Sequence, residues 1–171
     1  AETYQLTVQK NALENKNWNE QWERSFHPLL IDGFVYVHAT FHPVNQQVPY
    51  DIVIEPKMSF GTGHHPTTLQ MMRRMRLIDF KHTSVLDCGS GTGILAILAE
   101  KLGADNCTAL DNDEWCYKNC LENIEFNQSK SITALIGDLD TLGQRTFNRI
   151  LANIHRNFLL ENMGKLASLL V

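Results

Sequence analysis

The sequence predicts an α/β fold in which helices cover a doubly wound, mainly parallel sheet. Four short apolar segments each end in a polar residue, and segments with helical apolar spacing separate most of them. Strands that alternate with helices form parallel β-α-β units with right-handed crossovers. A second observation is the run SVLDCGSGTGILA at residues 84–96, where an apolar strand ends in a carboxylate and three alternate glycines before a helix begins. This order is typical of the first unit of a Rossmann-like sheet.

Before this run the sequence predicts short strands and one helix. These predictions rest on alternating apolar residues, on aromatic residues spaced four apart and on an Asp-Gly turn signal. The expected elements are a strand at residues 1–10, a helix at 17–26 bearing Trp18, Trp22 and Phe26, two strands around Asp32 and Gly33, a polar loop at 42–50, and a strand at 51–55.

The remaining residues predict the strands of the main sheet and the helices that cover it. Pro66 stands where helices often begin, and Gly103 stands where one ends. The expected elements are helices at 67–78, 94–102, 114–127 and 155–171, and strands at 84–88, 107–110, 132–136 and 149–152. A sheet that ended at the fourth of these strands would expose an apolar edge. We therefore expect that the chain is a fragment and that further strands are missing from it.

Composition excludes several classes of protein. With 171 residues, 43% of them hydrophobic and 20% charged, the chain fits one main globular domain with a small appendage. It has no apolar run of ~18 residues and no signal-peptide layout at its start, so we expect a cytoplasmic protein that does not contact a membrane. Its net charge of -4 and sparse basic clusters argue against direct nucleic-acid binding.

The cysteines do not predict a disulfide or a zinc site. Cys116 and Cys120 are four residues apart on an expected helix, where Cβ atoms lie ~5 to 6 Å apart, farther than the ~3.8 Å typical of a disulfide. No second cysteine pair or histidine has zinc-ligand spacing. Adjacent residues such as His64 and His65 rarely bind one ion, so we expect no metal.

The spacing of the glycines distinguishes between possible ligands. Dinucleotide-binding folds use G-x-G-x-x-G, whereas Gly89, Gly91 and Gly93 alternate and Asp87 precedes them. A carboxylate at this position would repel a pyrophosphate and attract a cation. The ammonium and sulfonium groups of S-adenosylmethionine fit this preference, and the glycines allow backbone amides to approach a ligand closely.

Each of the four strands ends in a polar residue, and ligands of doubly wound sheets bind at these ends. Asp87 lies at the end of the first strand. Asp111, beside Asn112, follows the second strand and could accept hydrogen bonds from both ribose hydroxyls. Asp138 follows the third strand, where the adenine amino group would lie. Asn153 follows the fourth, and its amide can donate and accept hydrogen bonds next to a reacting amine. Each residue alone also suits a strand-end cap, but all four together favour a cofactor site.

Several segments resemble a known family in order and spacing. NWNEQWERSFHPL, MSFGTGHHPTT, VLDCGSGTGILAILAEKLGA, ALDND and ILANI, within residues 13–160, are similar to the PrmA methyltransferases, which modify the eleventh large-subunit ribosomal protein. The resemblance implies a class I methyltransferase that uses S-adenosylmethionine to methylate lysine side-chain and N-terminal amines. It assigns cofactor contacts to Thr68, Gly89, Asp111 and Asn153, and to a covering loop containing Phe60, Thr62, Gly63 and His64.

The resemblance also implies a domain division and a partner. Residues 1–50 would be the remnant of a substrate-recognition domain with a linker region, and residues 51–171 the cofactor-binding methyltransferase domain without its last strands. The expected partner is a basic ribosomal protein of the large subunit, and we expect a monomer. The resemblance implies that both ends of the family's chain are missing here, so we expect cofactor binding more strongly than turnover.

The expected reaction is an in-line displacement in which a neutral amine attacks the sulfonium methyl group. Alignment of two bound reactants can supply ~7 to 11 kcal/mol, so the protein needs no nucleophile of its own. Asn153 would orient the amine and His64 would accept its proton. Three alternatives remain open: methylation of a small molecule or a nucleic acid, a non-catalytic cofactor-binding fragment, and an NAD enzyme.

Overall fold

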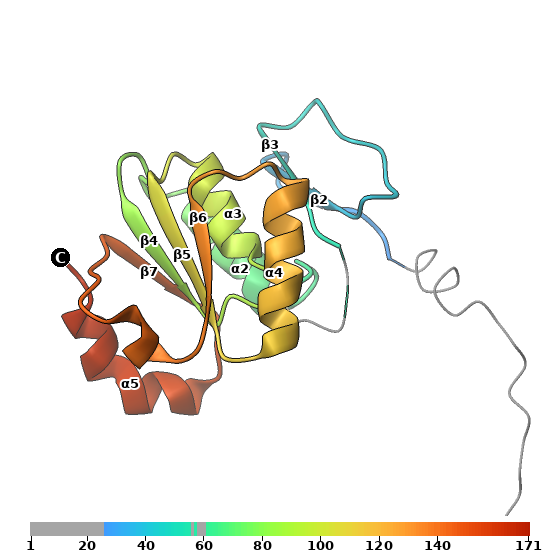
Figure 1. Ribbon diagram of the computed structural model, residues 1–171. Helices are drawn as coiled ribbons and strands as arrows, with labels where there is room; N and C mark the ends of the chain where they lie inside the picture. The colour runs from blue at the N-terminus through green and yellow to red at the C-terminus, as the bar shows by residue number, and fades with distance from the viewer. Residues whose placement is uncertain (1–25, 56, 58–60) are drawn as a thin grey trace, which may run out of the picture.

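The computed structural model describes residues 26–55, 57 and 61–171 of the chain (Figure 1). The strand expected at residues 1–10, Trp18 and Trp22 of the expected aromatic helix, and Phe60 lie outside the described residues. Among the helices that the structure describes, none combines the length and apolar character needed to cross a bilayer.

The main sheet has four parallel strands, which confirms the predicted α/β fold. It consists of β4 (Ser84–Cys88), β5 (Asn106–Asp111), β6 (Ile132–Ile136) and β7 (Arg149–Ala152) in the order β6-β5-β4-β7. The chain runs outward from β4 to β6 and then returns to the other side of β4 with β7. The strand order therefore reverses between β4 and β7, and doubly wound sheets bind ligands at such a reversal.

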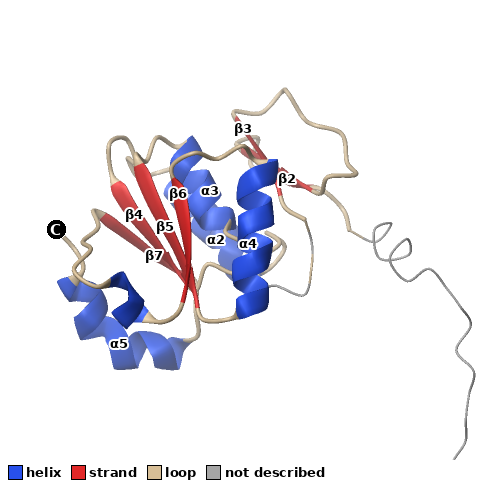
Figure 2. Ribbon diagram, in the orientation of Figure 1, coloured by secondary structure: helices blue, strands red, loops and turns tan. Residues whose placement is uncertain are grey.

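Helices cover both faces of this sheet (Figures 1 and 2). Successive side chains of a strand point to opposite faces. Accordingly Val85 of β4 packs with α3 (Ile94–Lys101), whereas Leu86 and Cys88 pack toward α5 (Arg156–Ser168). The helices α2 (Pro66–Met75) and α4 (Glu114–Phe126) lie on the same side as α3.

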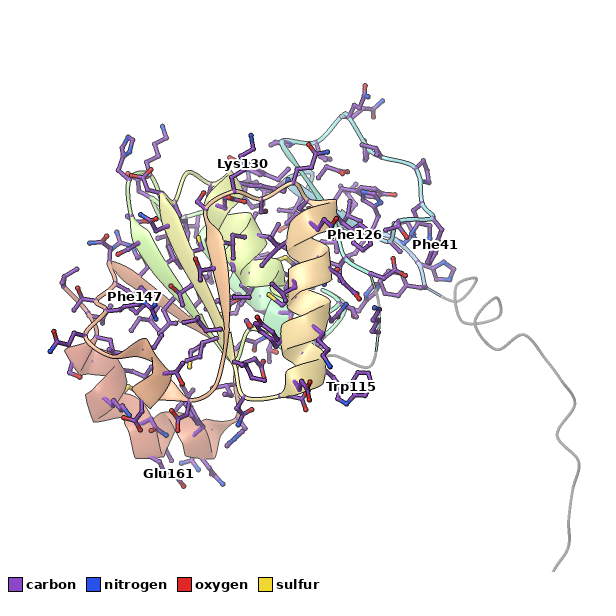
Figure 3. The ribbon with its side chains drawn as sticks, in the orientation of Figure 1. Phe41, Trp115, Phe126, Lys130, Phe147 and Glu161 are labelled. Carbon is purple, nitrogen blue, oxygen red and sulfur yellow. The ribbon has the colours of Figure 1, made fainter. Side chains whose placement is uncertain are left out.

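Several predicted boundaries differ from the observed ones. The first main helix, α2, ends at Met75 rather than at residue 78, and a short 3-10 helix, η1 (Leu139–Leu142), was not predicted. The last helix ends at Ser168 and does not continue to residue 171. Leu166 and Leu169 pack in one buried cluster with Phe147, which Figure 3 labels. After the helix ends, Leu170 forms a parallel bridge with Phe147.

A second, three-stranded sheet precedes the main one. A hairpin turn at Asp32 and Gly33, with φ angles of 50° and 66°, joins β1 (Leu29–Ile31) to β2 (Val35–His38) as the sequence predicts. The strand β3 (Tyr50–Val53) pairs in parallel with β2. This pairing crosses the boundary expected between residues 50 and 51. The apolar side chains of the small sheet share one buried core with α3.

Candidate cofactor-binding site

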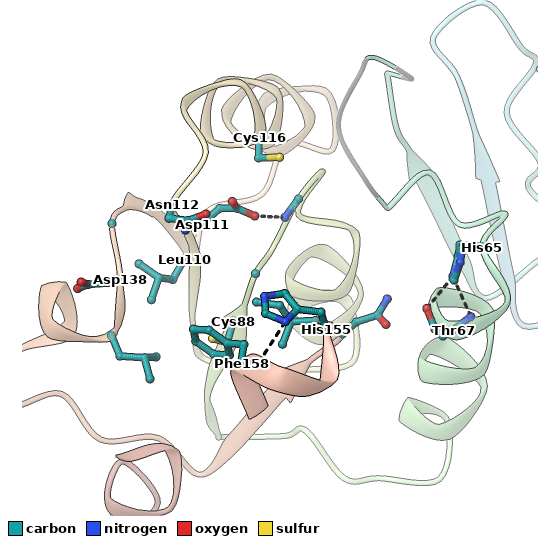
Figure 4. Close-up of a pocket in the computed structure, with 16 residues that line it drawn as sticks. His65, Thr67, Cys88, Leu110, Asp111, Asn112, Cys116, Asp138, His155 and Phe158 are labelled. Atoms are coloured by element: carbon teal, nitrogen blue, oxygen red, sulfur yellow. Dashed lines mark hydrogen bonds between the residues drawn. The ribbon is translucent and has the colours of Figure 1, made fainter. Parts of the chain in front are cut away.

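A cavity of about 550 Å³ opens at the carboxyl ends of the parallel strands (Figure 4). Its walls come from the residues that follow the four strands and from the starts of α2, α4 and α5. Six predicted site residues line it: Gly89, Gly91, Asp111, Asn112, Asp138 and Asn153. The structure thus brings together residues from all four strand ends, as the doubly wound topology requires.

The glycine turn contributes two of its three glycines to the cavity. Gly89 and Gly91 line it, and the backbone amides of Gly89 and Ser90 donate to the carbonyl of Leu110 at the end of β5. Gly93 does not line the cavity. It has a φ of +80°, and a Cβ atom at this position would lie 2.6 Å from Sγ of Cys120 on α4. Gly93 therefore serves the packing of α3 against α4 rather than a ligand contact.

Backbone amides hold the carboxylate of Asp111 in place at the end of β5. Its Oδ2 accepts a hydrogen bond from the Gly91 amide at 2.8 Å, and its Oδ1 accepts one from the Asp113 amide at 3.0 Å. A carboxylate has about four acceptor positions, so both oxygens can still accept from a ligand. Asp111 is thus a fixed acceptor for a group such as a ribose diol.

Asp87 lies behind the glycine turn and does not line the cavity. Its side chain is 1% exposed, and Oδ2 accepts a hydrogen bond from the Ala96 amide at 3.1 Å. Burial raises the pKa of Asp87 to about 8; the Ala96 hydrogen bond partly offsets this, and the charge of Asp111 adds to it. The other oxygen, Oδ1, has no hydrogen-bond partner among the described residues. Burial and the retained proton leave Asp87 without the fixed negative charge that the sequence predicts beside a cationic ligand.

Asp138 and Asn153 occupy the other two strand ends. Asp138 caps η1, because its Oδ1 accepts from the Asp140 amide at 2.9 Å, and it lines the cavity together with Leu139. Asn153 follows β7, and its Nδ2 donates to Oγ1 of Thr68 at 2.9 Å. This hydrogen bond leaves Oδ1 of Asn153 to accept from a ligand. Thr68 itself is 1% exposed and does not line the cavity.

The described residues of the expected covering loop lie away from the cavity. The side chain of His64 contacts Phe26, with ring centroids 4.8 Å apart, and its Nε2 donates to the carbonyl of His27 at 2.8 Å. Gly63 packs against Leu29, Val37 and Ile94. Oγ1 of Thr62 lies 3.4 Å from Nδ1 of His64. The structure therefore does not bring Thr62, Gly63 or His64 to the strand ends.

Two histidines that the sequence reasoning did not assign to the site do line the cavity. His65 caps α2 by accepting from the Thr67 amide, and His155 caps α5 by accepting from the Phe158 amide (Figure 4). Other unassigned lining residues are Thr67, Cys88, Leu110, Cys116, Gly137, Leu139, Ile154 and Phe158. His155 stands at the start of a predicted helix and two residues after the predicted strand-end residue Asn153, and this position is the signal that would have found it.

The cysteines of the core, Cys88, Cys107 and Cys120, are buried, unreactive thiols. Cys88 and Cys120 are buried, and burial raises the pKa of Cys88 to about 11 and that of Cys120 to about 12. A thiol is a nucleophile or metal ligand only as the thiolate. Within residues 26–55, 57 and 61–171, no group of three or more His, Cys, Asp and Glu side chains is arranged to hold a metal.

The topology and the strand-end site define a class I methyltransferase domain. A solved ribosomal protein L11 methylase from Lactobacillus delbrueckii subsp. bulgaricus superposes with a TM-score of 0.75 at 29% identity, covering 85% of this chain and 76% of that one. The family model for ribosomal protein L11 methyltransferase (PrmA) matches residues 1–171. The chain therefore belongs to the ribosomal protein L11 methyltransferase family.

Curated relatives carry the same family name. A protein from Bacteroides thetaiotaomicron is 49% identical over 161 residues, which is 93% of this chain and 58% of that protein. One from Porphyromonas gingivalis is 48% identical over 150 residues, or 86% of this chain and 52% of that protein. Both are named ribosomal protein L11 methyltransferase. The chain spans a little over half the length of these relatives.

Proposed function

We propose that this chain supplies the S-adenosylmethionine site of a methyltransferase that modifies lysine side-chain and N-terminal amines of a large-subunit ribosomal protein. The observation that carries the proposal is the convergence of Asp111, Asp138 and Asn153 with the glycine turn on one cavity, in a chain of this family. The protein would act in the cytoplasm as a monomer, without direct contact to nucleic acid.

The residues around the cavity fit this cofactor. Asp111 would accept from the ribose hydroxyls, and Asp138 from the adenine amino group. The absence of Cβ atoms at Gly89 and Gly91 opens the backbone to a ligand. When bound, S-adenosylmethionine supplies an electrophilic methyl group on a sulfonium.

The chain's own residues would orient the amine and exclude water. Thr68 holds the amide of Asn153 so that Oδ1 accepts a hydrogen bond from a neutral amine. Ile154 and Phe158 supply apolar wall beside it, which limits access of water. Correct alignment of two reactants is worth ~7 to 11 kcal/mol. His64 donates to the His27 carbonyl away from the cavity, so it is not the acceptor of the amine's proton in this reaction.

The substrate class agrees with the charge around the cavity. Asp111 and Asp138 line it, and the chain carries a net charge of -4. A basic protein segment is attracted to such a surface, whereas a nucleic-acid backbone is repelled. This difference favours a ribosomal protein over ribosomal RNA as the methyl acceptor.

Two measurements test the proposal. Thermal unfolding with S-adenosylhomocysteine or NAD should show stabilisation by the first and not by the second. Methyl-labelled S-adenosylmethionine, incubated with the protein and either large-subunit ribosomal proteins or ribosomal RNA, should label only protein. Stabilisation by NAD alone, or label on RNA alone, would contradict the proposed function.

A further inference from the structure

A row of asparagines on α4 holds the chain where it leaves β3. Asn127 accepts from the amide of Val53 at 3.0 Å and donates to its carbonyl at 2.6 Å. One turn earlier, Oδ1 of Asn123 accepts from the Glu55 amide at 2.8 Å, and two turns earlier Asn119 donates to the Glu55 carbonyl at 3.2 Å. Residues four apart share one face of a helix. These side-chain amides thus pair with the backbone of residues 53–55 as a neighbouring strand would.

Asn123 differs from Asn127 because it also contacts the glycine turn. Its side chain is fully buried, and its Nδ2 donates to the carbonyl of Thr92 at 2.9 Å. Thr92, between Gly91 and Gly93, is also fully buried. One amide group therefore bonds through its oxygen to Glu55, just after β3, and through its nitrogen to the cofactor turn. Among the described residues, the hydrogen bonds of the Asn127 side chain go to Val53 and to the Asn123 carbonyl, and none goes to the turn.

Thr92 extends this network to the residues before α2. Its Oγ1 donates to the carbonyl of Gly61 at 2.6 Å. Gly61 has a φ of +107°, and a Cβ atom there would lie 2.9 Å from the same hydroxyl oxygen. This approach is too close for any residue with a side chain. The turn is thus hydrogen-bonded to two points of the connection between β3 and α2. Asn123 links it to Glu55, and Thr92 bonds directly to Gly61.

The network also reaches the predicted ribose carboxylate. Gly91 directly precedes Thr92, and its amide donates to Oδ2 of Asp111 at 2.8 Å. A shift of Thr92 would move Gly91 and release this hydrogen bond. Buried hydrogen-bond networks favour one arrangement, because an unsatisfied buried polar group is costly.

We infer that Asn123 is a positioning residue for the cofactor site: it holds Thr92, and through Gly91 the carboxylate of Asp111, in the geometry that a ligand meets. This inference rests on the proposed function. It extends that function by coupling the site to the chain at Glu55. Because coupling is reciprocal, a ligand at the turn strengthens the hydrogen bond between Glu55 and Asn123.

Asn123→Ala and Asn127→Ala form a matched pair for testing this role. Each variant removes a side-chain amide that holds the backbone at residues 53–55. Only Asn123→Ala also removes a hydrogen bond to the glycine turn. We expect both variants to lower the melting temperature, and only Asn123→Ala to weaken S-adenosylhomocysteine binding by about tenfold in calorimetry. Equal affinities of the two variants would overturn the inference.

A measurement on the unmutated chain decides the question if Asn123→Ala fails to fold. Amide hydrogen exchange with and without S-adenosylhomocysteine reports the two backbone amides separately. We expect the ligand to slow exchange at Glu55 by about tenfold more than at Val53. Equal protection at both amides would overturn the inference alone. Failure of the unmutated chain to bind S-adenosylhomocysteine would overturn the proposed function, and this inference with it.

Discussion

The two carboxylates nearest the glycine turn differ because their surroundings differ. Asp111 accepts two backbone hydrogen bonds and lines the cavity, whereas Asp87 is buried, accepts one hydrogen bond and has a pKa raised to about 8. A sequence cannot tell a carboxylate that meets a ligand from one that lies behind it. Asp87 is buried because its side chain points from β4 toward α3, where it meets the Ala96 amide. Asp111 is held at the cavity because the Gly91 amide donates to it.

Replacement of Asp111 should weaken cofactor binding. Asp111→Ala removes charge-assisted hydrogen bonds worth ~1.5 to 3 kcal/mol, so calorimetry should show at least about tenfold weaker binding of S-adenosylhomocysteine. Asp113→Ala is the control, because it removes a nearby carboxylate that caps α4 and does not line the cavity. Unchanged affinity of Asp111→Ala would contradict its assignment.

Asp87 should make the stability of the chain depend on pH. Its pKa of about 8 in the folded chain lies above the ordinary value of 3.8, so the folded state retains the proton in between. The free energy of unfolding should therefore fall as pH rises from about 4 to about 8. Asp87→Asn, which resembles the neutral acid in shape, should remove this part of the dependence and be the more stable form at pH 8.

Chemical denaturation across this pH range measures the effect. Asp79→Asn is the matched control, because Asp79 is exposed and only caps a turn through the Lys81 amide. Its pH dependence should equal that of the unmutated chain. Parallel curves for Asp87→Asn and the unmutated chain would contradict a raised pKa.

Residues at the starts of three helices form part of the cavity wall. His65 and His155 cap α2 and α5, and Asp113 caps α4 by accepting from the Trp115 and Cys116 amides. All three helices begin next to the cavity, so the residues that end the strands and start the helices also form its wall. The predicted starts of these helices, at residues 67, 114 and 155, each lie within one residue of the observed starts, although the three caps themselves were not predicted.

The close packing of α3 against α4 depends on Gly93. Gly93→Ala would place Cβ 2.6 Å from Sγ of Cys120 at a φ of +80°, so we expect at least ~2 kcal/mol of destabilisation in chemical denaturation. Gly164→Ala is the contrasting change, because Gly164 lies within α5 with nothing within 4 Å of an added Cβ. It should stabilise by up to ~1 kcal/mol. Equal effects of the two changes would exclude this packing role.

In the whole molecule, the small sheet and the main sheet share a core. Ile52 of β3 and Val37 of β2 are fully buried in the same cluster as α3. The sequence predicted the hairpin at Asp32 and Gly33 but not the parallel pairing of β2 with β3. A parallel pairing joins segments separated by a loop, here residues 39–49, and no local pattern specifies it.

A core shared between the sheets should make them unfold together. Ile52→Ala deletes buried side-chain volume, so it should lower the free energy of unfolding by about 2 to 5 kcal/mol. Hydrogen exchange should then show the same loss of protection for amides of β2 and of β4. Loss confined to β1–β3 would show instead that the small sheet unfolds separately from the main sheet.

Local chemistry in the sequence was enough to predict the main strands and the residues at their ends. Strand β4 has the predicted bounds, and Asp111, Asp138 and Asn153 meet at one cavity, because parallel strands bring their carboxyl ends to the same edge. Only the tertiary structure decided which neighbours these residues have. Thr68 bonds to Asn153, Asn123 to Thr92 and His64 to His27, each across at least 31 positions of the chain. Such contacts follow from how whole elements pack, and no spacing within one segment encodes them.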